Sequence, residues 1–176
     1  MPNKDMSHHF LILCTGNICR SPMAEAVFKA RFTRSGFSVE SAGLAAPVGA
    51  PACALAVELM AERGVDISDH RARQVTWKML ERASLILTMD TSQQQAVVTT
   101  WPASRGRVQL LGRWSGTQIA DPYRQGRQAY QTALAAIERG LLHWEHWLIA
   151  GNPPKPLPPI WRRVFQPNPP NLIWPE

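Results

Sequence analysis

The chain has 176 residues, of which 45% are hydrophobic and 18% charged, and its formal net charge is +6. That length favours one domain with a buried core, and no apolar run approaches the roughly 20 residues of a membrane span. The first residues lack the apolar centre of a signal peptide, which, with three cysteines, favours the cytoplasm over a disulfide scaffold. A basic chain suits a nucleic acid, a membrane surface or an acidic substrate, and the scattered arginines argue against nucleic acid.

Short apolar runs alternate along the chain with segments whose apolar residues repeat at helical spacing. The runs predict four strands, at residues 8–13, 37–42, 84–88 and 107–111. The repeats predict helices at residues 22–34, 52–60, 77–82, 91–100 and 130–148, the first one capped by Ser21 with Pro22 at its first position. This alternation indicates a single three-layer α/β domain, with a parallel sheet, helices on both faces, and ligands beyond the carboxyl ends of the strands.

The composition changes sharply near the C-terminus. Residues 151–176 hold nine of the fifteen prolines, so this segment can be neither a helix nor a central strand. We predict a domain at residues 1–150 followed by a proline-rich C-terminal extension at residues 151–176. The extension either lies on the surface or forms a polyproline segment, with Trp161 and two arginines, that binds a partner or a neighbouring subunit.

Residues 14–21, Cys-Thr-Gly-Asn-Ile-Cys-Arg-Ser, connect the first predicted strand to the first predicted helix. A loop in this position presents backbone N–H groups and a helix N-terminus, both of which attract anions. Cys14 opens the loop and Arg20 closes it, a spacing that can wrap the loop around a tetrahedral oxyanion. The helix N-terminus and the cation both favour the thiolate form that a cysteine nucleophile needs.

Four further residues suit the attack of a cysteine on phosphorus. Ser21 can donate a hydrogen bond to the thiolate or to the departing sulfur. Asp121 is the candidate acid for the leaving oxygen, because its loop follows the fourth strand and should lie on the same side of the sheet. Gly16 lets the backbone approach a ligand, and Asn17 tolerates the left-handed conformation of tight loops. Cys14 and Asp121 also have plainer explanations, since a lone cysteine is usually a core residue and an Asp-Pro pair usually starts a turn.

Residues 14–26, Cys-Thr-Gly-Asn-Ile-Cys-Arg-Ser-Pro-Met-Ala-Glu-Ala, resemble the phosphate-binding loop and first helix of low-molecular-weight protein tyrosine phosphatases. Four stretches agree in order: Ser-Ala-Gly at 41–43, Asp-His-Arg-Ala-Arg-Gln at 69–74, Leu-Ile-Leu-Thr-Met at 85–89 and Asp-Pro-Tyr at 121–123. The resemblance covers residues 8–150 and implies a flavodoxin-like parallel sheet with strand order 2-1-3-4. Ser-Ala-Gly-Leu at 41–44, and Asp-Pro-Tyr-Arg at 121–124 where animal members carry Asp-Pro-Tyr-Tyr, resemble bacterial members that oppose tyrosine autokinases in capsule and exopolysaccharide export.

The resemblance implies a protein tyrosine phosphatase that works through a phosphocysteine on Cys14. Asp121 would protonate the tyrosine oxygen and then help water to hydrolyse the intermediate, with Ser21 assisting the thiolate. No cofactor and no metal is implied. The equatorial oxygens of the phosphate would be held by Arg20 and by the amides of the loop, which comprises Cys14, Thr15, Gly16, Asn17, Ile18, Cys19 and Arg20.

The resemblance also assigns supporting roles. Asn17, Ser41 and His70 would hold the loop in shape, although His70 suits an exposed helix end and Ser41 an ordinary strand-end hydroxyl equally well. Cys19 is similar to the family's second loop cysteine, which can form a disulfide with the nucleophile, so reversible redox inactivation is one hypothesis and simple space filling another. Cys53, at the start of a helix, is predicted to be structural.

Three residues are expected at the mouth of the site. Tyr123 and Leu44 would line it for the aromatic ring of phosphotyrosine, with core packing as the alternative for Leu44. Arg124 stands where animal members carry a second tyrosine, so it would replace a ring wall by a cation. Such a cation could attract acidic residues beside the substrate tyrosine.

Three rival functions share this loop. Thioredoxin-coupled arsenate reductases need two cysteines well downstream, and this chain has none after Cys53. Protein arginine phosphatases carry threonine in place of Ile18, whose apolar side chain favours phosphotyrosine. A catalytically silent phosphate-binding module is disfavoured, because nucleophile, cation and acid are all present. The predicted partner is a phosphotyrosine protein, in particular a tyrosine autokinase, while the substrate's identity and the oligomeric state stay open.

Overall fold

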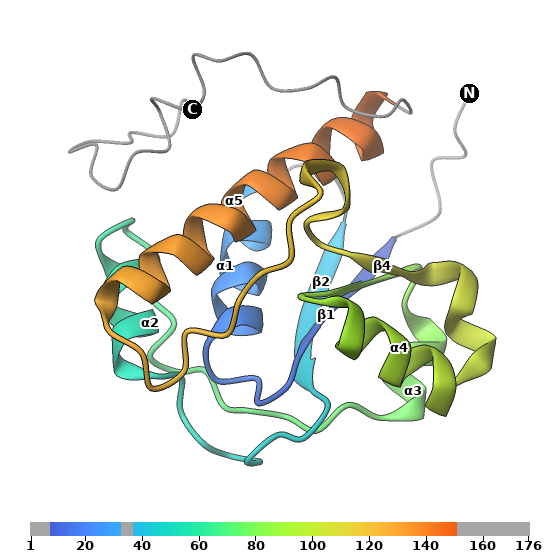
Figure 1. The fold of residues 1–176 in the computed structure, drawn as a ribbon, viewed down its shortest axis with the longest axis horizontal. Helices are drawn as coiled ribbons and strands as arrows, with labels where there is room; N and C mark the ends of the chain where they lie inside the picture. The colour runs from blue at the N-terminus through green and yellow to red at the C-terminus, as the bar shows by residue number, and fades with distance from the viewer. Residues whose placement is uncertain (1–7, 33–36, 151–176) are drawn as a thin grey trace.

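The computed structural model describes residues 8–32 and 37–150, so the predicted extension at residues 151–176 lies outside the described part. Its centre is a parallel sheet with the strand order β2-β1-β3-β4, as predicted (Figure 1). Each strand begins and ends within one residue of its predicted range. The strands are β1 (His9–Cys14), β2 (Ser38–Gly43), β3 (Leu85–Thr88) and β4 (Val108–Leu110).

Helices cover both faces of the sheet, which confirms the three-layer α/β architecture (Figure 1). One face carries α1 (Arg20–Phe32), α2 (Ala54–Ala61) and α5 (Arg127–Ala150), and the other carries α3 (Trp77–Arg82) and α4 (Thr91–Thr100). Two 3-10 helices, η1 (Pro102–Arg107) and η2 (Arg113–Ser115), were not predicted, because such short segments show no apolar repeat.

The first helix starts earlier than its sequence pattern indicates. Because α1 begins at Arg20, Ser21 and Pro22 lie within its first turn and not at the predicted cap and first position. Arg20, the last residue of the predicted anion-binding loop, is therefore itself helical. Asp90 caps the N-terminus of α4, since its carboxylate accepts a hydrogen bond from the Gln93 N–H at 2.9 Å.

The central strand β1 is buried on both faces, as its continuous apolar run predicts. Phe10 and Ile12 pack into the cluster formed with α1, α2 and α5. Leu11 and Leu13 pack into the opposite cluster with α3 and α4. Packing from both sides fixes the carboxyl end of the strand, where Cys14 lies.

Candidate active site

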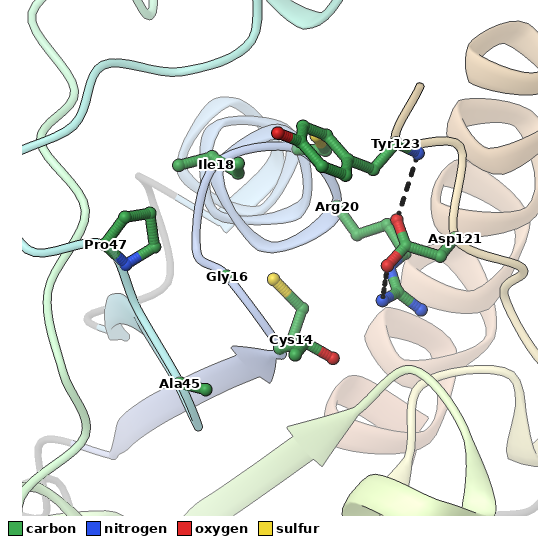
Figure 2. Close-up of a pocket in the computed structure, with 10 residues that line it drawn as sticks. Cys14, Gly16, Ile18, Arg20, Ala45, Pro47, Asp121 and Tyr123 are labelled. Carbon is green, nitrogen blue, oxygen red and sulfur yellow. Dashed lines mark hydrogen bonds and ion pairs between the residues drawn. The ribbon is translucent and has the colours of Figure 1, made fainter. Parts of the chain in front are cut away.

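A pocket of about 240 Å³ opens at the carboxyl end of β1 (Figure 2). Most of its lining was predicted from the sequence, but the contribution of Ala45 and Pro47 was not. These two residues come from the loop that follows β2. The full lining is Cys14, Thr15, Gly16, Ile18, Cys19, Arg20, Ala45, Pro47, Asp121 and Tyr123.

The Cys14 sulfur lies at the base of the pocket and has two hydrogen-bonding neighbours. The Asn17 N–H donates to it at 3.1 Å, and the Ser21 hydroxyl lies 3.0 Å away. The Ser21 oxygen also accepts a hydrogen bond from the Asn17 side-chain amide at 2.9 Å, so its own hydrogen is available to the sulfur. Two donors aimed at one sulfur stabilise a thiolate, which supports Cys14 as the nucleophile.

Asn17 holds the loop in its curved shape. Its φ angle is +55°, the left-handed conformation expected from the sequence, and its side chain is fully buried. The side-chain nitrogen donates to Ser21 and Ser41, both at 2.9 Å, and the side-chain oxygen accepts from the Arg73 N–H at 2.8 Å. One amide therefore connects the loop to α1, to β2 and to the segment before α3.

The predicted supporting set comes together around this amide. His70 Nε2 donates to the Asn17 carbonyl at 2.7 Å, and the Ser41 hydroxyl donates to the Glu25 carboxylate of α1. His70 and Ser41 thus contact the loop and are not merely a helix-end histidine and a strand-end hydroxyl. Glu25 and Arg73 belong to the same network but were not predicted, since a glutamate and an arginine on exposed-looking segments carry no sequence signal of their own.

Replacing Asn17 with alanine should lower the free energy of unfolding by about 2–4 kcal/mol, because buried donors and acceptors on three segments lose their partner. Urea denaturation of the purified variant measures this. Gln95 of α4 is exposed, so its replacement by alanine is a control that also removes an amide side chain. Gln95→Ala should change the free energy of unfolding by less than about 0.5 kcal/mol. Equal effects of the two substitutions would contradict the structural role of Asn17.

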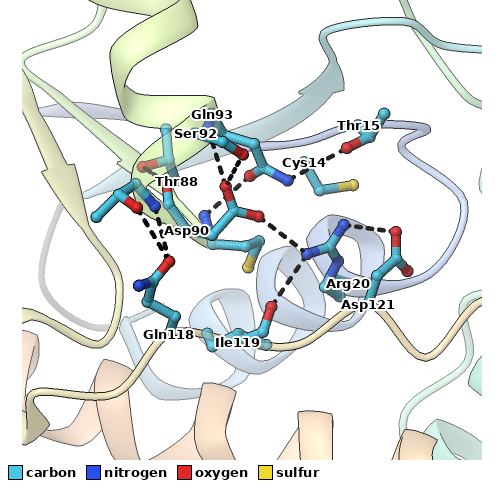
Figure 3. A network of polar contacts seen from close by, with 12 residues as sticks. Cys14, Thr15, Arg20, Thr88, Asp90, Ser92, Gln93, Gln118, Ile119 and Asp121 are labelled. Atoms are coloured by element: carbon cyan, nitrogen blue, oxygen red, sulfur yellow. Dashed lines mark hydrogen bonds and ion pairs between the residues drawn. The ribbon is translucent and has the colours of Figure 1, made fainter.

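The guanidinium of Arg20 is held from several directions (Figure 3). Its Nη1 donates to the Ile119 carbonyl at 3.0 Å and to the Asp90 carboxylate at 3.4 Å, and its Nη2 donates to the Asp121 carboxylate at 2.7 Å. Arg20 is only 3% exposed, so these contacts set its orientation toward the pocket. One carboxylate oxygen of Asp90 caps α4 and the other makes this contact with Arg20, which was not predicted.

Asp121 reaches the pocket from a loop more than a hundred residues away in sequence. Its side chain is 49% exposed. The carboxylate oxygen that does not contact Arg20 accepts a hydrogen bond from the Tyr123 N–H at 3.1 Å. Pro122 lies between these two residues. The carboxylate is therefore fixed beside Arg20 while it stays open to a ligand, which is the position predicted for the acid (Figure 2).

The mouth of the pocket differs in part from the prediction. Tyr123 lines it, but Leu44 does not: it packs against the core cluster of α3 and α4, which was its alternative assignment. Ala45 and Pro47 take that place. Arg124 also does not line the pocket, and its guanidinium lies 5.3 Å from the centre of the Tyr123 ring, so it contacts that ring and does not form a separate wall.

The turn that follows β2 is attached to the start of the Cys14 loop. The Leu44 N–H donates to the Cys14 carbonyl and the Ala45 N–H to the Thr15 carbonyl, both at 2.9 Å, although β2 itself ends at Gly43. A Cβ on Gly43 would lie 2.7 Å from the Thr15 carbonyl oxygen. This close approach requires glycine at position 43. In the turn that follows, Leu44 packs against the core and Ala45 lines the pocket.

Cys19 lines the pocket but its sulfur has partners in the core. It lies 2.7 Å from the sulfur of Cys53 and 3.2 Å from the hydroxyl of Tyr130. Cys53 therefore has a thiol neighbour that its isolated position in the sequence does not indicate. All three cysteines are present as free thiols.

Two general features of the described residues complete the site. None of the helices in residues 8–32 and 37–150 has the length and apolarity to cross a membrane. Within the same ranges, no group of three or more His, Cys, Asp or Glu side chains is arranged to hold a metal ion.

Comparison with known proteins identifies relatives of this arrangement. A family model described as "Low molecular weight phosphotyrosine protein phosphatase" matches residues 9–150. The "Probable low molecular weight protein-tyrosine-phosphatase EpsP" of Ralstonia nicotianae is 48% identical over 134 residues, which is 76% of this chain and 91% of that protein.

Solved structures give the same picture of the fold. Wzb of Vibrio vulnificus, in complex with benzylphosphonate, has a TM-score of 0.74 and 35% identity and covers 79% of this chain and 97% of its own. The YwlE arginine phosphatase of Geobacillus stearothermophilus has a TM-score of 0.77 and 29% identity, and the match covers 82% of this chain and 94% of the YwlE chain. Tyrosine and arginine phosphatases thus share this architecture, and the residues of the pocket must distinguish them.

Proposed function

Because the chain belongs to the low molecular weight phosphotyrosine protein phosphatase family, we propose that it hydrolyses phosphotyrosine in proteins through a phosphocysteine on Cys14. One observation carries this proposal above the others. Arg20 donates to Asp121 at 2.7 Å at one side of a pocket that also holds the hydrogen-bonded Cys14 sulfur. A nucleophile, an oxyanion-binding cation and an acid therefore face one small volume.

In the first step, the Cys14 thiolate attacks phosphorus and the bond between phosphorus and the tyrosine oxygen breaks. The phosphoryl oxygens are held by Arg20 and by loop N–H groups at the N-terminus of α1. Asp121 gives its proton to the departing tyrosine oxygen. Because Asp121 and Arg20 are adjacent, an oxyanion bound by the guanidinium brings its fourth oxygen close to that carboxyl group.

In the second step, water attacks the phosphorus of phosphocysteine and the sulfur departs as a thiolate. Asp121, now a carboxylate, accepts a proton from the attacking water. The Ser21 hydroxyl and the Asn17 N–H, which lie 3.0 and 3.1 Å from the sulfur, stabilise the negative charge that returns to it. Inorganic phosphate then leaves, and the starting thiolate is restored.

The lining of the pocket supports an aromatic substrate. Ile18, Pro47 and Tyr123 provide apolar surface above the loop, which suits a phenyl ring better than a charged guanidinium. The Wzb relative was solved with benzylphosphonate, an aromatic phosphonate. A β-branched hydrocarbon at Ile18 offers no hydroxyl to a guanidinium-linked phosphate, which disfavours the arginine phosphatase alternative.

Purified, reduced protein should hydrolyse a phosphotyrosine peptide and leave a phosphoarginine peptide almost untouched, since the pocket wall at Ile18 is apolar. Release of inorganic phosphate measures both reactions. The Ile18→Thr variant should shift the ratio of kcat/KM values toward phosphoarginine. Preferential hydrolysis of phosphoarginine by the unmodified chain would contradict the proposed substrate.

We further propose that the cellular substrate is a tyrosine autokinase of polysaccharide export, met in the cytoplasm. The sequence features that favour these relatives, at residues 41–44 and 121–124, support this assignment. The net charge of +6 favours encounter with an acidic phosphorylated tail. We propose that residues 1–150 form the phosphatase domain and that residues 151–176 are an extension outside it.

A further inference from the structure

The two cysteines that the catalytic steps do not use lie against each other beneath the active-site loop. Their sulfur atoms are 2.7 Å apart, although 34 positions separate them in the sequence. The Cys53 N–H also donates to the Ile18 carbonyl at 2.8 Å, so the start of α2 is attached directly to the loop. The Tyr130 hydroxyl of α5, 3.2 Å from the Cys19 sulfur, completes a polar cluster in an apolar surrounding.

Cys19 also belongs to the active site. It lines the same pocket as Cys14. Its sulfur also contacts the Cys53 sulfur, which does not line the pocket, so Cys19 connects the two thiols. Burial and the hydrogen bond to Cys53 raise the pKa of the Cys19 thiol well above its usual range. Cys19 is therefore a thiol at neutral pH, whereas the Cys14 sulfur has donors that stabilise a thiolate. An oxidant that enters the pocket thus reacts first at Cys14.

We propose that Cys53 is a resolving thiol, so that oxidation of the active site by hydrogen peroxide ends as a Cys19–Cys53 disulfide and returns Cys14 to its reduced state. This inference rests on the assignment of Cys14 as the nucleophile in the proposed function. It differs from reversible inactivation by a Cys14–Cys19 disulfide, because that bond becomes an intermediate and the catalytic sulfur is recovered.

The steps balance with hydrogen peroxide as the oxidant. The Cys14 thiolate attacks one peroxide oxygen, the O–O bond breaks, and a sulfenic acid and hydroxide form. The Cys19 thiol displaces the sulfenic oxygen as water and forms the Cys14–Cys19 disulfide. Hydroxide removes the Cys53 proton, giving the second water, and the Cys53 thiolate attacks the Cys19 sulfur and releases the Cys14 thiolate. In total, one peroxide and two thiols give one disulfide and two waters.

Peptide mapping distinguishes the possible products. Trypsin places Cys14 and Cys19 together in the peptide 5–20 and Cys53 in the peptide 35–63. We propose to treat reduced protein with hydrogen peroxide, block free thiols with iodoacetamide, digest without reductant and identify the peptides by mass spectrometry. The expected product joins the two peptides through Cys19 and carries the alkyl group on Cys14. A disulfide within the peptide 5–20, with Cys53 alkylated, would overturn the proposal, as would sulfinic acid on Cys14 without any disulfide.

Activity measurements on variants test the recovery of Cys14. After the same peroxide treatment, the unmodified chain should keep most of its activity on p-nitrophenyl phosphate. Cys53→Ser and Cys53→Ala should be as active as the unmodified chain when reduced, lose most of that activity after peroxide, and regain it with dithiothreitol. Equal resistance of these variants and the unmodified chain would contradict the relay. Failure of the reduced, unmodified chain to hydrolyse any phosphate ester would contradict the proposed function instead, and the disulfide map is read independently of activity.

Discussion

Replacing Cys14 with serine should reduce turnover of p-nitrophenyl phosphate to background, a loss of at least about 10⁴-fold. The serine oxygen would occupy the position of the sulfur and keep the hydrogen bonds from Asn17 and Ser21. Those neighbours are donors that stabilise a thiolate already formed, and a serine hydroxyl stays protonated near neutral pH. Initial rates in reducing buffer, with circular dichroism to verify the fold, measure the effect.

A matched substitution removes a different sulfur. Cys53→Ser deletes a half-buried thiol outside the pocket lining, so under reducing conditions it should leave kcat close to that of the unmodified chain. The Cys14→Ser variant should still bind inorganic phosphate, because the loop N–H groups and Arg20 remain in place. Turnover by Cys14→Ser well above background would exclude a phosphocysteine intermediate.

The fold follows closely from the sequence because its signals are local and repeated. The continuous apolar run of β1 and the stripe of apolar residues along α5 specify elements that burial then confirms. The start of α1 is less well specified. Ser21-Pro22 is typical of a helix start, yet the helix begins at Arg20, so the last residue of the loop already has helical geometry.

The part of the candidate site that lies within one continuous segment could be predicted from the sequence. Cys14, Asn17 and Arg20 lie within one loop, and their contacts follow from its curvature. Two contacts between distant segments were not predicted: Asp90 also reaches Arg20, and Cys53 lies against Cys19. Such pairs depend on how two elements dock, and neither side chain has a local pattern that indicates its partner.

The error at Leu44 has a more specific physical cause. An apolar residue just after the end of a strand is compatible with either a pocket wall or the core. The choice depends on how the turn after β2 docks on the active-site loop. The Leu44 and Ala45 N–H groups both donate to carbonyls of that loop, and in this turn Leu44 packs against the core while Ala45 lines the pocket.

Replacing Asp121 with asparagine should lower kcat on a phosphotyrosine peptide by about 10²–10⁴-fold, because the leaving tyrosine oxygen loses its proton donor. Asparagine retains an oxygen that can accept the hydrogen bond from Arg20, so the guanidinium should keep its orientation. Steady-state kinetics on the peptide measure the loss. The exposed Glu81 of α3 is a matched control, and Glu81→Gln should leave kcat unchanged.

The dependence on the leaving group separates proton donation from positioning. The phenol of p-nitrophenyl phosphate is more acidic than tyrosine and leaves with less help from an acid, so Asp121→Asn should slow this substrate much less than phosphotyrosine. Asp90→Asn provides the contrast, since Asp90 contacts the same guanidinium at 3.4 Å but does not line the pocket. A residue that only orients Arg20 should affect both substrates equally. Equal losses for Asp121→Asn would therefore assign Asp121 to the orientation of Arg20, and a loss confined largely to phosphotyrosine assigns it to the transfer of the proton.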